Sequence, residues 1–170
     1  MSNPNSTDRI SIQNLSDVEI DLEVYLSWLR NVRDNEFIES ARVDYTLSEL
    51  SSYLKTKLQS SNVEFWGIFL NSVEFIGTVK LEPIDFSLRT AWVGIMIGDP
   101  SQRGKGYGFS ALELVSDYSA RVLSLKELRL GVDKKNSGAV KMYERAGFSV
   151  TEYRDSSLIM AKYLENVTEL

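Results

Sequence analysis

QRGKGYG, residues 102–108, places glycine at every second position immediately before an amphipathic run. Glycine adopts positive φ angles without strain and lets the backbone approach a ligand closely. Successive backbone amides in such a loop can point at an anion. The apolar spacing that follows predicts a helix over residues 107–123, whose unpaired N-terminal amides and positive dipole end face the same loop. The stretch therefore predicts a binding site for a diphosphate group.

Two familiar glycine motifs do not fit this loop. The dinucleotide fingerprint needs G-x-G-x-x-G in the first strand–helix turn, whereas these glycines alternate and lie deep in the chain. The P-loop needs four residues between its first glycine and a Gly-Lys-Ser/Thr string, which the sequence lacks. For so short a match, a plain turn before a helix is the alternative interpretation.

Length and composition predict one soluble domain. A chain of 170 residues can bury one sizeable core but not two. We expect the core to span about residues 9–164, with disordered tails at 1–8 and 165–170. No apolar run approaches the ~20 residues that span a bilayer, and the first residues lack the basic and apolar regions of a signal peptide. The prediction is a cytoplasmic protein without a membrane partner.

The sequence contains neither cysteine nor histidine. Their absence excludes a thiol nucleophile, a Ser-His-Asp triad and the ordinary zinc sites, so no metal site is predicted. Proton transfer is left to carboxylates, tyrosine, lysine or water. A net charge of −5 gives no overall attraction to nucleic acid, so a small or cationic substrate is the easier partner.

Hydrophobic periodicity predicts an alternation of strands and helices. The pattern has the order β-α-α-β-β-β-α-β-α-β-β. The expected elements are strands near 10–13, 63–70, 73–81, 90–97, 127–132, 148–153 and 158–163, and helices near 22–30, 47–59, 107–123 and 137–146.

Local signals refine these boundaries. Thr46 and Glu49 have the spacing of a capping box at the start of the second helix. Residues 71–72, Asn-Ser, predict a two-residue hairpin turn, and Pro83 predicts the end of the strand that follows it. Residues 15–24 fit either an alternating strand or a helix entered through a Ser-x-x-Glu capping box.

The glycine loop resembles the acetyl-CoA loop of the GNAT superfamily of N-acetyltransferases, whose pattern is Gln/Arg-x-x-Gly-x-Gly/Ala. A second stretch, Asn136-x-x-Ala139-x-x-x-Tyr143-x-x-x-Gly147-Phe148, is similar to a downstream signature of that family. The element order also agrees. Within the family the chain most resembles the branch of ribosomal-protein N-terminal and aminosugar N-acetyltransferases. The resemblance implies an α/β (α+β) fold with a mixed sheet of about seven strands and four helices.

The resemblance implies acetyl-CoA as co-substrate. In this family the strands here at 90–97 and 127–132 splay apart, and the pantetheine arm lies between them. Backbone amides near Met96 and Ile97 are then expected to hold the thioester carbonyl. The remaining expected cofactor-binding residues are Gln102, Arg103, Gly104, Lys105, Gly106, Tyr107, Gly108 and Asn136.

The catalytic residues are less well marked. Relatives often carry a glutamate base on the strand before the loop, but the comparable positions here are Trp92 and Ile95. Glu82 is our candidate base, and a strand-end surface charge is its alternative role. Tyr143 is the candidate acid for the leaving thiolate, or else a core aromatic. Asn136 contacts the pantetheine arm, caps its helix, or does both.

The resemblance predicts acetyl transfer to a primary amine, with a small molecule such as an aminosugar as the leading acceptor. A protein N-terminus and a non-catalytic role in acyl-CoA binding are the alternatives, and the acidic balance argues against aminoacyl-tRNA. In this fold the acceptor pocket is formed largely by residues 31–45 and 154–157, where Arg33, Arg42 and Tyr45 are candidates. A homodimer is compatible with the resemblance.

Overall fold

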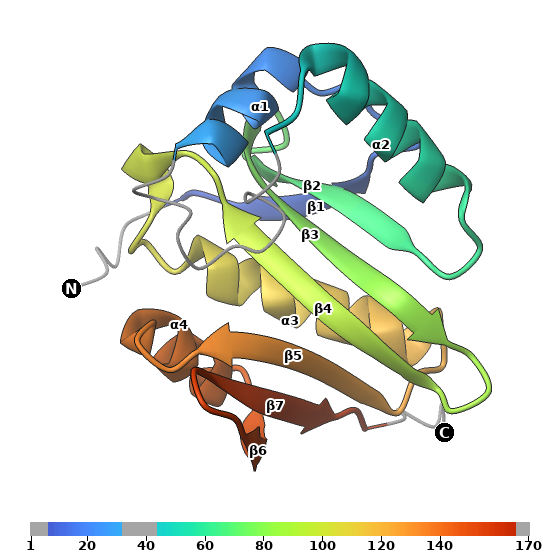
Figure 1. Ribbon diagram of the computed structural model, residues 1–170, viewed down its shortest axis with the longest axis vertical. Coiled ribbons are helices and arrows are strands. Elements are labelled where there is room, and N and C mark those ends of the chain that lie inside the picture. The colour runs from blue at the N-terminus through green and yellow to red at the C-terminus, as the bar shows by residue number, and fades with distance from the viewer. Residues whose placement is uncertain (1–6, 32–43, 166–170) are drawn as a thin grey trace.

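The computed structural model describes residues 7–31 and 44–165, and its elements follow the predicted order (Figure 1). Seven strands and four α-helices are present in these ranges, together with one short 3₁₀ helix. The strands are β1 (Ile10–Asn14), β2 (Glu64–Leu70), β3 (Glu74–Asp85), β4 (Thr90–Ile97), β5 (Glu127–Asp133), β6 (Ser149–Tyr153) and β7 (Ser157–Tyr163). The helices are α1 (Leu22–Arg30), α2 (Leu47–Gln59), α3 (Tyr107–Arg121) and α4 (Ser137–Arg145), and η2 is the 3₁₀ helix Pro100–Gln102.

The strands form a single mixed sheet in the order β1-β2-β3-β4-β5-β7-β6. All neighbours pair antiparallel except β4 and β5, which are parallel and are connected through α3. The strongly apolar β4 occupies the middle of the sheet, as its composition predicted. The predicted fold class is confirmed.

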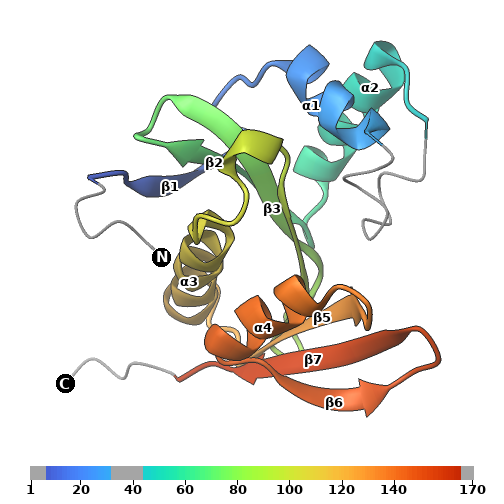
Figure 2. The same cartoon turned by 90° about the vertical axis from the view of Figure 1, so that its left-hand side faces the viewer.

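Helices cover the two faces of the sheet unequally. Figure 2 shows α3 and α4 on one face and α1 and α2 on the opposite face. The first pair covers a large core that includes Leu112, Leu128 and Met160, whereas α1 and α2 close a smaller core around Leu50 and Phe65. The second face is therefore covered mainly at its β1–β3 side, and Gly94 of β4 is exposed on it.

The start of α1 settles the ambiguous residues 15–24. Asp21 is the N-cap, and its carboxylate accepts hydrogen bonds from the amides of Glu23 and Val24. The capping box expected at Ser16 was therefore wrong, because a carboxylate five residues later caps the helix instead. The capping box of Thr46 and Glu49 at the start of α2 is confirmed.

Strand β3 runs through Pro83, although proline was expected to end it. The ladder with β4 is interrupted between Leu81 and Ile84 and resumes with Ile84 opposite Ala91. Proline has no N–H to donate, and the local irregularity lets the strand accommodate it. The backbone amide of Ile84 donates to the carbonyl of Asn62.

The β2–β3 hairpin and the end of α4 follow their sequence signals. Asn71 and Ser72 both have positive φ angles, +52° and +66°, as a type I′ turn requires. Gly147 has a φ of +93° just after α4, which is the left-handed position that favours glycine. The β-turn at Asn71 and Ser72 and the position of Gly147 are confirmed, but Leu70 pairs with Glu74, so the hairpin loop has three residues instead of the expected two.

Candidate active site

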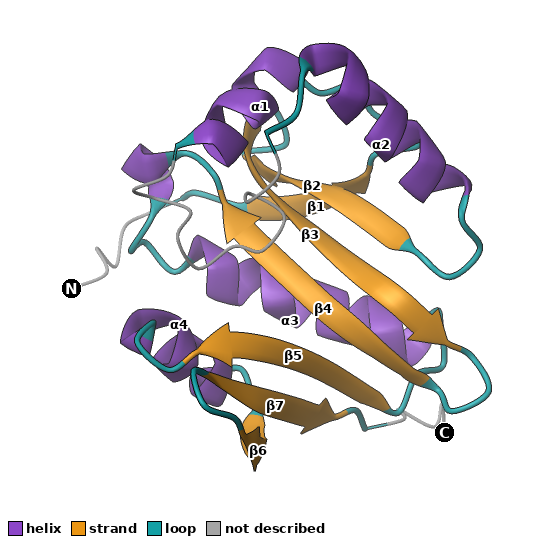
Figure 3. Cartoon of the chain, in the orientation of Figure 1, coloured by secondary structure: helices purple, strands orange, loops and turns teal. Residues whose placement is uncertain are grey.

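The parallel strands β4 and β5 pair only at their first residues. Thr90, Ala91 and Trp92 lie opposite residues 127–129, and no further pairs are formed between the two strands. Figure 3 shows the strands close together where they begin and apart at their arrowheads. This gap, the β4–β5 gap, opens beside the end of β4 where the chain enters the glycine loop. The splayed strands implied by the resemblance are present.

Strand geometry determines which β4 amides face the gap. Along a strand, consecutive backbone groups point alternately to the two neighbouring strands. The amide of Gly98 donates to Ile76 of β3, and the carbonyl of Met96 lies against Gly77 of β3. Met96 therefore turns its backbone away from the gap, contrary to our expectation. The alternation assigns Ile97, as expected, and Ile95, which we had not listed as a donor, to the gap.

The glycine loop has the conformation that its sequence predicted. Gly104 and Gly106 have φ angles of +71° and +84°, and a Cβ at either position would meet no atom within 4 Å. As far as the described residues go, the space next to both glycines is open. Gly106 is also the N-cap of α3, and no side chain caps that helix. The N-terminal amides of α3 and the loop thus offer donors and a positive dipole end together, which suits a diphosphate.

Gly108 has a different role from the two loop glycines. It is the second residue of α3 and is buried. A Cβ at Gly108 would stand 3.0 Å from the sulfur of Met142 on α4. The absence of a side chain therefore allows α3 and α4 to pack closely, while the Gly108 amide remains at the helix N-terminus.

The polar side chains of the loop contact other parts of the protein. Arg103 donates from Nε to the carbonyl of Ile97 at 2.8 Å and from Nη2 to that of Gly98 at 3.3 Å. Lys105 donates to Gln102, which in turn donates to Glu74. Arg103 therefore holds the entry of the loop against the end of β4, instead of extending its charge freely toward a phosphate.

Tyr107, the first residue of α3, reaches the N-terminal segment. Its hydroxyl donates to the carboxylate of Asp8 at 2.8 Å. This hydrogen bond raises the pKa of the Tyr107 phenol above its ordinary value, with smaller contributions from burial and from the charges of Asp8 and Glu74. The contribution that Tyr107 can make to a diphosphate site is therefore its backbone amide.

Tyr143 lies on α4 and is 9% exposed. Its ring packs edge-to-face on Phe148 with the centroids 5.9 Å apart. Burial raises the pKa of the Tyr143 phenol to about 12. The residue is thus part of the core, as one interpretation held, and it also keeps its proton at any ordinary pH. A proton donor toward the gap remains compatible with this environment.

Asn136 caps α4, as predicted. Its side-chain oxygen accepts from the amide of Ala139 at 3.3 Å. Its backbone amide donates to Asp133 at the end of β5, which connects the helix to the strand that borders the gap. The contact with pantetheine stays a prediction.

Glu82 lies on the face of the sheet that α2 partly covers, and it contacts two lysines. It accepts from Lys57 of α2 and, at 3.1 Å, from Lys80 of β3. Burial alone would raise the pKa of Glu82, but the hydrogen bonds and charges of Lys57 and Lys80 outweigh it and hold the pKa below its usual value. A carboxylate stabilised in its charged form is a poor base, so the geometry does not favour the role we expected.

Sequence reasoning missed the group that surrounds Glu82. The Lys80 ammonium also donates to the hydroxyl of Tyr53 at 3.2 Å. Lys57 and Lys80 both lie 5 to 6 Å from the centroid of the Tyr53 ring, at 5.4 and 5.9 Å. Lysines spaced far apart in the sequence carried no motif that could identify this cluster.

The expected acceptor segment is only partly described. Arg33 and Arg42 lie outside the described residues. Tyr45 packs on Tyr53 with the ring centroids 5.5 Å apart, and its carbonyl accepts from Arg30. On the other segment, Arg154 is paired with Glu152 at 2.8 Å and both side chains are more than half exposed.

Two surface grooves lie away from the glycine loop and the β4–β5 gap. Two surface grooves of about 430 and 660 Å³ border α1 and α2, and neither is lined by residues of the loop or the gap. Within residues 7–31 and 44–165, no group of histidine, cysteine or acidic residues could hold a metal ion. In the same ranges, no helix has the length and apolarity needed to cross a membrane.

The chain has a mixed sheet with splayed central strands, next to a glycine loop and an uncapped helix. These features define a class of domains that can bind a diphosphate attached to a long, extended chain. Residues 9–149 match the family model described as "Acetyltransferase (GNAT) domain". The chain therefore belongs to the GNAT acetyltransferase family.

Curated relatives match parts of the chain. The probable N-acetyltransferase YjcK of Bacillus subtilis is 36% identical over 94 residues, which are 54% of this chain and 51% of that protein. Spermidine N(1)-acetyltransferase of Escherichia coli is 42% identical over 77 residues, 45% of this chain and 41% of that protein. The chain thus spans about half the length of these relatives.

Solved structures match nearly the whole chain. Spermidine N-acetyltransferase from Vibrio cholerae, in complex with CoA and spermine, has a TM-score of 0.77 and 22% identity, covering 94% of this chain and 96% of that one. A domain from Methanocaldococcus jannaschii has a TM-score of 0.76 and 22% identity, covering 92% and 99%. At these identities the likeness shows a common fold.

Proposed function

We propose that the chain is an N-acetyltransferase that moves the acetyl group of acetyl-CoA directly to the primary amine of a small molecule. The observation that carries the proposal is the meeting of three features at one place: the open glycine loop, the uncapped N-terminus of α3 and the β4–β5 gap. Family membership supports it.

The loop and α3 would hold the diphosphate of the co-substrate. Backbone amides of residues 104–109 are the donors, and because glycine at 104 and 106 leaves open space, the phosphate oxygens can approach them. Acetyl-CoA supplies the activated acyl group when bound. The gap between β4 and β5 accommodates the extended arm.

Ile95 and Ile97 would stabilise the charge that develops on the carbonyl oxygen during transfer. Their amides point into the gap by strand alternation, next to the loop. The loss of one such preorganised donor costs about 3 kcal/mol of transition-state stabilisation in other enzymes. The carbonyl of Ile97 is fixed by Arg103, which restrains the orientation of this strand end.

Tyr143 would donate a hydrogen bond to the sulfur of the leaving thiolate. A thiol has an ordinary pKa of about 8.5. With a pKa of about 12, the buried phenol stays protonated and donates a hydrogen bond to the thiolate more readily than it surrenders its proton. The direct proton donation that we expected of Tyr143 is thereby replaced by a hydrogen bond to the thiolate, which then takes its proton from solvent.

The amine must lose a proton before it attacks. Glu82 was our candidate for this step, but two lysines hold it in its charged form. We therefore assign proton removal to water at the open face of the sheet beside Gly94. A rate that rises with pH until the acceptor amine is deprotonated is the expected signature.

Two small-molecule acceptor classes are candidates. An aminosugar is the class we expected from the sequence, and a polyamine is suggested by relatives named for spermidine. A protein N-terminus and non-catalytic acyl-CoA binding are the remaining alternatives. Thiol release from acetyl-CoA, measured against aminosugars, polyamines and short peptides, separates all four. Acetyl-CoA binding without release on any amine would favour the non-catalytic role.

A further inference from the structure

Half-buried charges next to the β4–β5 gap are not balanced. Lys57, Lys80 and Glu82 form a cluster of two ammonium groups around one carboxylate, the Lys57–Glu82–Lys80 cluster. Their side chains are only 26%, 28% and 21% exposed. Counting the residues that the structure describes, the cluster therefore carries one excess positive charge within a protein whose net charge is −5.

The surroundings of Lys80 keep that charge in place. The Lys80 ammonium lies 5.9 Å from the ring centroids of both Tyr53 and Phe65, where aromatic faces stabilise a cation. Burial alone would lower the pKa of Lys80, but Tyr53 and Glu82 together raise it. Lys80 is thus a permanent cation at physiological pH.

The cluster adjoins the place where the strands part. Lys80 is the register partner of Gly94, and its side chain lies 3.8 Å from where a Gly94 Cβ would stand. Gly94 is two residues, roughly 7 Å of strand, past Trp92, the last β4 residue paired with β5. Ile95, with its amide in the gap, is the next residue. The Lys80 side chain therefore lies beside the part of β4 that borders the gap.

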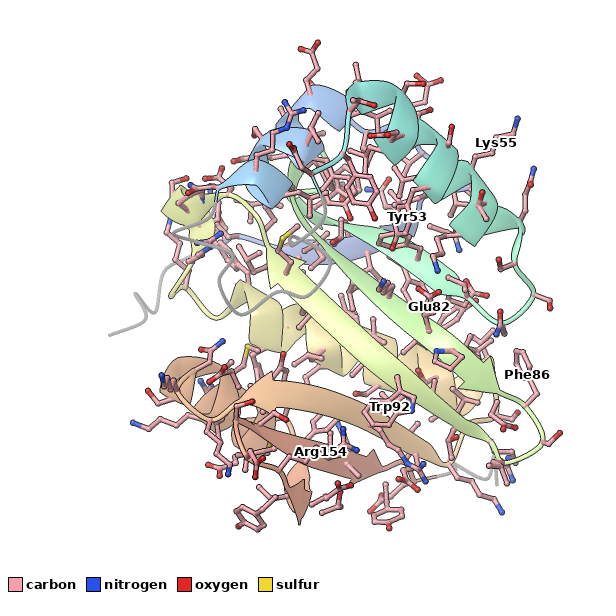
Figure 4. All side chains as sticks on the ribbon, viewed as in Figure 1. Tyr53, Lys55, Glu82, Phe86, Trp92 and Arg154 are labelled. Carbon is pink, nitrogen blue, oxygen red and sulfur yellow. The ribbon has the colours of Figure 1, made fainter. Side chains whose placement is uncertain are left out.

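Side-chain orientations agree with this placement. Figure 4 shows Tyr53, Glu82 and Trp92 on the viewer's side of the sheet, which is the face open beside β4, and Lys55 directed away from it at the outer side of α2. An acceptor that approaches the gap over Gly94 must pass the cluster. Glycine at that position leaves the path free of a side chain.

We propose that the acceptor amine carries an anionic group, a carboxylate or a phosphate, which the Lys57–Glu82–Lys80 cluster binds while the amine reaches the β4–β5 gap. The proposal rests on the proposed function and narrows its substrate class. A half-buried ammonium for which the described residues provide no second carboxylate attracts an anion and repels a polycation. Acceptor chemistry here thus differs from that of the relatives named for spermidine.

The test compares acceptors that differ only in the anionic group. Binding to protein saturated with CoA is measured by calorimetry for two pairs: lysine against cadaverine, which lacks the carboxylate, and glucosamine 6-phosphate against glucosamine. Spermidine is the polycationic probe. We expect the anionic member of at least one pair to bind ten- to a hundredfold tighter, the range of charge-assisted hydrogen bonds. The pair that responds identifies carboxylate or phosphate.

Substitutions assign the preference to the cluster. Lys80→Met removes the excess charge and leaves the Lys57–Glu82 pair intact, so the preference should fall to within about threefold of unity. Lys57→Met, which leaves the Lys80–Glu82 pair, is the second variant if the first does not fold. Lys55→Met removes a positive charge from the exposed side of α2 and should leave the preference unchanged.

Three outcomes would overturn the proposal: no preference in either pair, tighter binding of spermidine or cadaverine, or a preference that survives both cluster variants. These outcomes are independent of the proposed function, because acetyl-CoA binding and thiol release are measured separately. If the protein binds acetyl-CoA and acetylates spermidine best, the proposed function stands and the proposed preference for anionic acceptors is wrong.

Discussion

The indole of Trp28, on α1, lies against the α-carbon of Gly98, the residue that follows β4. A Cβ at Gly98 would stand 2.1 Å from the Trp28 ring carbon Cε3, a distance that real side chains do not reach. The same indole packs on Phe75 of β3 with the ring centroids 4.8 Å apart. This contact fixes α1 against the strand end from which the glycine loop departs.

Gly98→Ala should therefore destabilise the protein. Overpacking of a tight contact typically costs about 1 to 3 kcal/mol. Gly94→Ala, four residues earlier and within β4, is the matched control, because a Cβ there would meet only Lys80 atoms at an ordinary 3.8 Å. Urea unfolding of the two variants measures the difference. Equal stabilities would mean that Trp28 moves aside without cost.

Gly106→Ala should lower both stability and the affinity for acetyl-CoA. Alanine at a φ of +84° costs about 1 to 2 kcal/mol, and the loop can relieve that strain only by turning its amides away from the bound anion. We expect about a tenfold rise in the dissociation constant, measured by calorimetry. Gly138→Ala, in the first turn of α4 with open space around it, should leave the affinity as it is. A Gly106 variant of unchanged affinity would remove the loop from the binding site.

Much of this architecture was predictable from the sequence. The capping box of Thr46, the turn at Asn71 and the left-handed Gly147 follow from local chemistry, because each needs only its own neighbours to form. The glycine loop and the signature around Tyr143 were found for the same reason. The roles expected of these two stretches come from family motifs, and each motif lies within one short segment of sequence.

Other features depend on distant residues and could not be predicted. The two ammonium groups around Glu82 come from α2 and β3, and only the fold brings them together. Met96 was expected in the gap, but its direction is set by the register with β3, which a one-residue shift would reverse. The continuation of β3 past Pro83 likewise depends on its pairing with other strands.

If Tyr143 has the role that we propose, Tyr143→Phe should lower kcat about a hundredfold and leave the Michaelis constant for acetyl-CoA nearly unchanged, because the hydroxyl would act only when negative charge develops on sulfur. The ring and its packing on Phe148 are retained, so unfolding should be unaffected. Tyr118→Phe, near the C-terminal end of α3, is the control. A kcat within a few-fold of wild type would limit Tyr143 to the core.

The raised pKa of Tyr143 also predicts the alkaline behaviour. A phenol whose pKa is about 12 in the folded protein stays protonated through the ordinary titration of tyrosine near pH 10. Its contribution to stability is complete below pH 10 and is lost as the pH rises toward 12. Ionisation of Tyr143 should therefore cause no decline of kcat below pH 10. A decline centred near pH 10 that disappears in Tyr143→Phe would contradict the assignment.

Glu82→Gln should change stability more than turnover. The substitution removes the carboxylate that both Lys57 and Lys80 contact, and we expect a loss of about 1 kcal/mol at pH 7, since the pairs are partly exposed. The pKa of Glu82 is lowered by folding, so its contribution is present above the ordinary value of 4.5 and is lost as the pH falls through the lower folded value. Denaturation at neutral and acidic pH checks this. A hundredfold loss of kcat would instead restore Glu82 as the base.

The central claim is that the backbone at residues 104–109 grips the diphosphate of acetyl-CoA while the arm lies between β4 and β5. A two-dimensional ¹⁵N–¹H spectrum titrated with acetyl-CoA tests it residue by residue. We predict the largest shifts at the amides of the loop and the first turn of α3, with further shifts at Ile95 and Ile97. A saturating titration that moves amides elsewhere and leaves these in place would contradict the account.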